Sequence, residues 1–194
     1  MDYFLFINLN FQTKMNITNI YKMIDHLEKS VPDNRFDMVC YRNANKDRVN
    51  HECKSVGCII GHCTILDKNF ENPSYYREPV LKGILFYSWS IEFTDILIDE
   101  IWEWCFSENW WYIDNKKKGA INRLKYLMKI RETSKDDEEC HEKLISSIKG
   151  LGDLTFNDFL EHFDDEYDTE IWIDEENRLE FKNWYKTEIL NLEN

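Results

Sequence analysis

Apolar residues recur at the helical spacing i, i+3, i+4, i+7 in several separate stretches of this chain, and this periodicity limits its fold more than any other feature. The stretches lie at residues 17–27, 97–106, 120–128, 144–148, 156–163 and 179–192. Only 3 prolines and 6 glycines interrupt the 194 residues, so the helical pattern meets few breaks. The sequence therefore predicts a mainly α-helical protein.

Within this fold we expect a compact body of about four helices and two or three more at the C-terminal end. Ser55 can cap a helix through Ile65, in which Gly57 and Gly61 would share one face and let a neighbouring backbone approach. The segment YFLFINLNF predicts a minor strand within residues 1–14. The 12 Phe, 10 Tyr and 7 Trp can fill a core, since each buried ring removes roughly 150–250 Å² from water.

The net negative charge of the chain lies entirely in its last third. Residues 134–194 hold 19 acidic and 6 basic side chains, whereas residues 1–133 hold 18 of each. We therefore predict two parts, a neutral helical body at 1–130 and an acidic helical module at 134–194, with residues 130–139 as the candidate linker. The apolar stripes of the acidic part indicate a folded module and not a solvated tail.

The start of the chain, MDYFLFINLNF, has no basic region ahead of its apolar run, which ends at Asn8. No apolar run reaches the 18 residues that a membrane span needs. We expect a cytoplasmic protein, within a host cell, that has no membrane contact and no cofactor. In that compartment its six cysteines would be reduced thiols: Cys40, Cys53, Cys58, Cys63, Cys105 and Cys140.

Histidines and cysteines are densest in HECKSVGCIIGHC, residues 51–63. His51, Cys53, Cys58 and His62 together would supply the four nitrogen and sulfur ligands that structural zinc prefers. Their spacing, H-x-C-x₄-C-x₃-H, matches no standard zinc finger. Packing of small side chains in a tight helix is the alternative, and the sequence favours it, so we expect no metal.

The same segment carries a family resemblance. SVGCIIGHC resembles the Gly-Thr/Ser-Val/Ala-x-Cys-x-x-Gly-His/Trp-Ala core of an uncharacterised group of small phage and mobile-element proteins. FDMVCY before it and WEWCFSENWW with AINRLKYLM after it are similar to flanking pieces of that group, so the resemblance covers about residues 17–130. Lys54 and Cys63 stand where that group usually has Gly and Ala. The group has no assigned catalytic residues, and the resemblance implies a phage accessory protein.

The run DDEYDTEIWIDEE, residues 164–176, is the most acidic segment. Read as a calcium-binding EF-hand loop it puts Asp164, Glu166, Asp168 and Glu175 at ligand positions. Thr169, however, occupies position 6, where the sharp turn requires glycine. A solvated acidic connection between two helices is therefore the favoured interpretation.

Catalytic motifs are weak throughout. Cys58, Cys63 or Cys140 could meet His51, His141 or His162 in space, yet no nucleophile or oxyanion motif supports any pair. We expect no enzyme. A basic stretch can dock the acidic part, either within one chain or in a dimer; it consists of Lys116–Lys118, Arg123, Lys125, Lys129 and Arg131. Its first three lysines are typical of a solvated loop end.

The favoured function is inhibition by protein–protein binding. A folded acidic surface can occupy the basic nucleic-acid channel of a host antiviral defence nuclease, for example an RNA-guided one, as an anti-CRISPR protein does. Direct binding of nucleic acid is disfavoured by the net charge. Trp110, Trp111 and Trp172 are candidate anchors, with core packing as the alternative. The predicted partner-binding residues are Asp164, Asp165, Glu166, Asp168, Glu170, Trp172, Asp174, Glu175 and Glu176.

Two other function classes stay open. One is a viral structural, assembly or adaptor protein, and the other is a small zinc-binding protein built on the His51–Cys63 segment.

Overall fold

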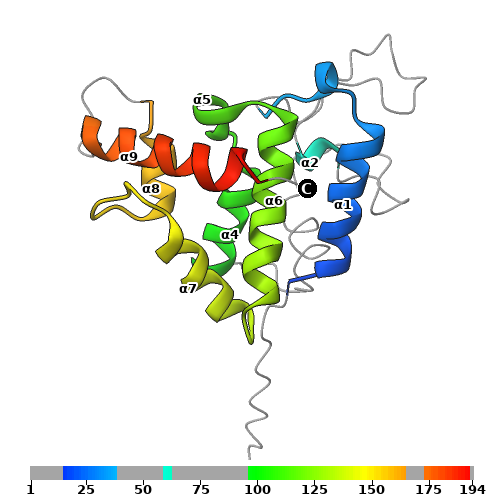
Figure 1. Ribbon diagram of the computed structural model, residues 1–194, viewed down its shortest axis with the longest axis horizontal. Coiled ribbons are helices and arrows are strands. Elements are labelled where there is room, and N and C mark those ends of the chain that lie inside the picture. The colour runs from blue at the N-terminus through cyan, green and yellow to red at the C-terminus, as the bar shows by residue number, and fades with distance from the viewer. Residues whose placement is uncertain (1–14, 39–58, 63–95, 165–172, 193–194) are drawn as a thin grey trace, which may run out of the picture.

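The computed structural model describes residues 15–38, 59–62, 96–164 and 173–192, and these residues are mainly helical (Figure 1). The described part contains no strand, which confirms the predicted mainly α-helical fold. In chain order its elements are α1 (Ile17–Ser30), the 3₁₀ turn η1 (Asp33–Arg35), α2 (Ile59–His62), α4 (Ile96–Phe106), α5 (Trp110–Asp114), α6 (Lys117–Glu132), α7 (Asp137–Ser147), α8 (Phe156–Glu161), α9 (Glu175–Tyr185) and the π-helical turn η4 (Lys186–Leu190).

Helix α6 is the central element. It contacts α1, α4, α7 and η4. Figure 1 shows α1 and α2 on one side of α6 and α7, α8 and α9 on the other. The acidic last third of the chain thus forms one side of the molecule, and the N-terminal helix forms the opposite side.

Short polar residues set the helix starts. The side chains of Asn16, Asp136, Thr155 and Asp174 each accept a hydrogen bond from a backbone N–H in the first turn of the helix that follows. For α8, the Thr155 hydroxyl oxygen accepts from the Asp158 backbone N–H at 3.2 Å. At the other end, α1 stops at Ser30 because Val31 precedes a proline and takes an extended conformation.

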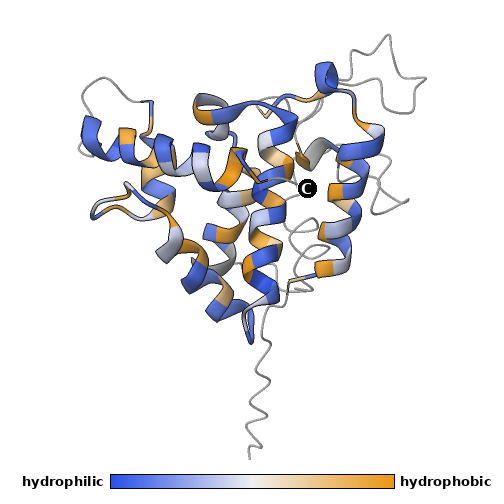
Figure 2. Ribbon diagram, viewed as in Figure 1, coloured by the Kyte–Doolittle hydropathy of each residue, from blue (hydrophilic) through white to orange (hydrophobic). Residues whose placement is uncertain are grey.

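One hydrophobic core spans both sides of the charge boundary. Trp104 of α4 packs its ring 5.7 Å from that of Phe156 and 6.1 Å from that of Trp184, measured between ring centroids. Trp110 of α5 lies 5.5 Å from Tyr185 by the same measure. Figure 2 shows apolar stretches on the sides of the helices that face one another. Aromatic rings of the acidic third therefore complete the core of the preceding helices, and the division into two domains stays a prediction.

Trp110 is a correction to the sequence analysis. It was a candidate surface anchor, but its side chain is fully buried and its indole N–H donates to the Glu103 carbonyl oxygen at 3.0 Å. Trp111, the next residue, is 46% exposed. The two neighbours differ because α5 presents one face to Phe181 and Tyr185. For Trp110 the alternative of core packing is the correct one.

Two further expectations differ from the structure. Lys116–Lys118 are not a loop end, since α6 begins at Lys117. The predicted linker is also shorter than 130–139, because α6 continues to Glu132 and α7 starts at Asp137. The predicted helix from Ser55 to Ile65 overlaps α2, and its remaining residues, like the predicted strand within 1–14, lie outside the described part of the chain.

Candidate functional site

The acidic segment predicted to bind a partner is fixed to the core at both ends. Phe163 before it is 3% exposed and Ile173 near its end is 2% exposed. Asp164 and the first residues of α9 are exposed. The predicted residues Asp165, Glu166, Asp168, Glu170 and Trp172 lie outside the described residues. Both ends of this acidic segment therefore lie at the surface, each next to a buried apolar residue, Phe163 or Ile173.

Three of the predicted residues open α9. Asp174 caps the helix, because its Oδ1 accepts a hydrogen bond from the Asn177 backbone N–H at 2.7 Å. Glu175 and Glu176 occupy the first turn, where negative charge is favourable to the helix dipole. Both glutamates are exposed, and neither forms an ion pair with another described residue. The two carboxylates therefore stabilise the start of α9 and remain accessible to a binding partner.

Other acidic side chains on the same side of α6 are also exposed, and they make no ion pair within the described ranges. They are Glu138 and Glu142 of α7, Glu161 of α8 and Glu180 of α9. On the α1 side the acids are paired instead. Glu28 binds the Lys125 ammonium at 2.7 Å, and Asp33 binds that of Lys117 at 2.8 Å. The uncompensated negative charge is therefore concentrated on one side of the molecule.

The basic stretch of α6 is largely used inside the fold. Arg131 Nε donates to Asp137 Oδ1 at 2.6 Å, and Arg123 Nη1 donates to the Tyr185 hydroxyl at 2.9 Å. Both partners belong to the last third of the chain. Arg123 and Arg131 thus hold the acidic part against α6 within one chain. This is the first of the two alternatives predicted for the basic stretch, docking in cis and docking in a dimer.

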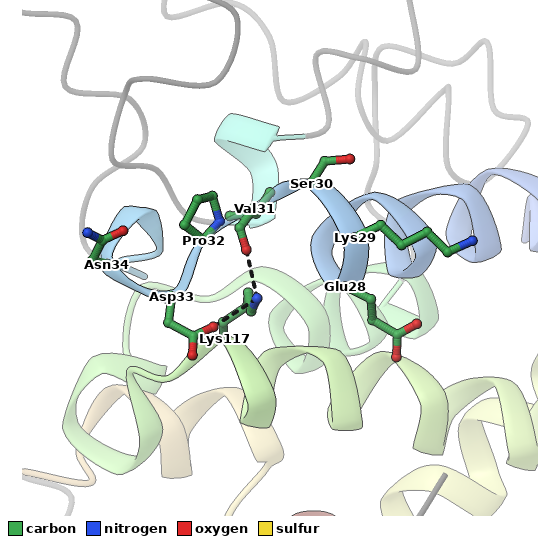
Figure 3. A pocket seen from close by; sticks show the side chains of 8 residues that line it. All are labelled: Glu28, Lys29, Ser30, Val31, Pro32, Asp33, Asn34 and Lys117. Carbon is green, nitrogen blue, oxygen red and sulfur yellow. Dashed lines mark hydrogen bonds and ion pairs between the residues drawn. The ribbon is translucent and has the colours of Figure 1, made fainter.

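Two adjoining hollows lie between the end of α1 and the start of α6. The first has a volume of about 550 Å³ and is lined by residues 28–34 and Lys117. Figure 3 shows Lys117 turned toward the Val31 carbonyl oxygen, to which it donates at 2.7 Å. The second, of about 940 Å³, extends along α6 to Leu190–Leu192. Lys117 and Lys125 in these hollows form ion pairs with Asp33 and Glu28.

The candidate nucleophile Cys140 is a buried core residue. Its side chain is 0% exposed, and burial raises the pKa of its thiol to about 12. At neutral pH it is a protonated thiol, which is a poor nucleophile. Among the candidate bases, His141 bonds Glu100 of α4, and His162 has its Nδ1 2.9 Å from the Asp158 carbonyl oxygen. Cys58, Cys63 and His51 lie outside the described residues.

The candidate zinc set falls mostly on residues that are not described, namely His51, Cys53 and Cys58. His62 is buried, and its Nε2 lies 3.4 Å from the Arg35 carbonyl oxygen. Within the described ranges, no group of three or more histidine, cysteine, aspartate or glutamate side chains is arranged to hold a metal ion. Most of the candidate calcium loop is likewise not described.

One polar cluster escaped the sequence analysis. The Tyr185 hydroxyl donates to Asp114 Oδ2 at 3.0 Å and accepts from the guanidinium of Arg123, which is fully buried and stacks 4.0 Å from the Trp110 ring centroid. A signal was present, because Arg123 stands three residues after Ala120 and four before Leu127, on the apolar stripe. A cation at that position predicts a buried partner.

The described helices include none that is long and apolar enough to cross a membrane. Comparison with protein families, curated proteins and solved structures found no match to the chain.

Proposed function

We propose that this chain is a non-enzymatic inhibitor that binds a host antiviral defence nuclease through its acidic side, as an accessory protein of a phage or mobile element acting in the host cytoplasm. The observation that carries the proposal is the anchored acidic edge. Phe163 is buried just before the acidic segment and Ile173 is buried near its end, while Asp164, Glu175 and Glu176 are exposed beside them.

Charge complementarity favours a partner of one kind. Nucleases that handle DNA or RNA hold the phosphate backbone in channels lined with lysine and arginine. A rigid array of carboxylates can occupy such a channel and gains speed from electrostatic steering. The separation of paired acids near α1 from exposed acids on α7 to α9 gives the molecule one binding side.

The first experiment is capture of a partner from the lysate of a phage-sensitive host with the full chain as bait. The proposal expects one nuclease complex, identified by mass spectrometry, with binding that weakens as salt rises from 0.05 to about 0.5 M because screening shortens the range of the charges. Recovery of the protein in stoichiometric amounts within intact virions, with no nuclease captured, would contradict it.

The second experiment is charge reversal of Asp164, Asp165, Glu166 and Asp168 to lysine. We expect inhibition of the captured nuclease to fall at least tenfold, mostly through slower association, because the steering field is reversed at the contact. The matched control reverses four exposed acids away from that side, Asp25, Glu28, Asp33 and Glu108, and should change inhibition less than threefold. Equal losses in both variants would mean that net charge and not this edge governs binding.

A further inference from the structure

Two histidine rings from different helices lie side by side where α2 meets α1. The centroids of the His26 and His62 rings are 6.1 Å apart, and the ring planes are inclined by 49°. His62 is buried and His26 is half-buried. In the sequence, His62 stands beside the cysteines of the candidate zinc set, whereas His26 belongs to no candidate site.

His26 has an unused nitrogen. Its Nε2 is buried and has no hydrogen-bond partner. A buried polar atom without a partner is costly, and a native structure that keeps one gives reason to look for a ligand. The lone pair of an imidazole nitrogen can bind a metal ion when the ring is neutral.

His62 offers a second nitrogen at the same place. Its Nε2 is 3.4 Å from the Arg35 carbonyl oxygen. That separation is longer than the usual hydrogen-bond distance of about 2.9–3.0 Å, so this particular contact is a weak one.

The ring spacing suits one shared ion. With metal–nitrogen distances of about 2.1 Å and roughly 1.1 Å from nitrogen to ring centre, each ring centre lies about 3.2 Å from the metal. A tetrahedral angle at the metal then places the two ring centres about 5 Å apart. The observed 6.1 Å is about 1 Å longer, so binding of one shared ion requires the two side chains to rotate toward each other by that amount.

We propose that His26 and His62 form a binding site for a divalent transition-metal cation that prefers imidazole ligands, such as nickel, copper or zinc, with water in the remaining positions. The bound ion ties α2 to α1. Such an ion binds the folded chain only, so it raises the stability of the fold in proportion to the logarithm of its concentration.

Nickel is the probe for the test, with the full reduced chain in a buffer free of chelators. Calorimetric titration should show about one bound ion, and excess nickel should raise the melting temperature. His26→Gln and His62→Gln should each lower the affinity at least about tenfold and remove the thermal shift. His162→Gln is the matched control, since it removes a histidine on α8, and it should keep both responses.

His26→Leu separates a ligand from a merely structural residue. It removes the unpaired nitrogen, so without metal its melting temperature should equal or exceed that of the natural chain, while the response to nickel disappears. Nickel binding of unchanged affinity in the His26 and His62 variants would overturn the proposal, as would equal loss in the His162 variant.

Discussion

At the scale of single residues, the tightest constraint is the space around Asp114. A Cβ added to Gly119 would lie 1.6 Å from Asp114 Oδ2, the oxygen that accepts the Tyr185 hydroxyl. Helix propensity alone favours alanine over glycine in α6 by about 1 kcal/mol. We predict the opposite effect: Gly119→Ala should lower the free energy of unfolding by about 1–3 kcal/mol. The added methyl group displaces the buried Asp114 carboxylate from the Tyr185 hydroxyl, which in turn is bonded to Arg123.

Urea unfolding measures this loss directly. Lys118→Ala is the control, since it makes a neighbouring helix position alanine at an exposed side chain and should change the free energy of unfolding by less than about 0.5 kcal/mol. A Gly119→Ala protein at least as stable as the natural chain would show that Asp114 can be displaced without cost.

At the scale of elements, the interface of α4 with α7 holds two buried thiols, Cys105 and Cys140. Burial raises the pKa of both, that of Cys140 to about 12. In the unfolded chain a cysteine thiol has a pKa of about 8.5. Burial of the neutral thiol therefore contributes fully to the stability of the fold below that pH, and this contribution is lost as the pH rises toward 12. We predict that Cys140 resists alkylation at pH 8 in the folded chain.

Mass spectrometry of labelled peptides checks this prediction. In urea Cys140 should react as fast as a free thiol, whereas in the folded chain its labelling should be at least a hundredfold slower, because reaction requires α7 to open. Equal rates in both states would mean that α7 does not stay docked on α4.

The elements themselves were predictable to different degrees. Periodicity identified α1, α4, α6 and α9, since each buries one long face. It missed α5, whose five residues are too few to show a period. It also misjudged Lys117, because a cation in the first turn opposes the helix dipole, and only the fold reveals the Val31 carbonyl and Asp33 that compensate it.

The candidate site was less predictable than the fold. Asp174, Glu175 and Glu176, which the acidic composition predicts to bind a partner, are exposed, and their binding role stays a prediction. It could not tell Trp110 from Trp111, because burial depends on which face a short helix turns inward. Nor could it pair His26 with His62, since the two are 36 positions apart in the chain and meet only through the packing of α1 on α2.

At the scale of the whole molecule, charge and packing divide the chain differently. The charge changes near residue 133, but Trp104 on one side of that boundary packs against Phe156 and Trp184 on the other. Arg131 and Asp137 form an ion pair across it, with side chains 11% and 10% exposed. The acidic part therefore supplies core residues to the preceding helices and is not held by charge alone.

We accordingly predict one cooperative unfolding transition for the full chain. Phe156→Ala should cost about 3–5 kcal/mol, because a fully buried ring is removed from a shared core. Tryptophan fluorescence and far-ultraviolet circular dichroism should then shift to lower urea together, with one midpoint. If the acidic third were an independent domain, the same substitution would unfold it first and leave a second transition at the original midpoint. A rigid shared core also bears on the proposed inhibitor, since it would hold the ends of the acidic segment at a fixed spacing against a partner.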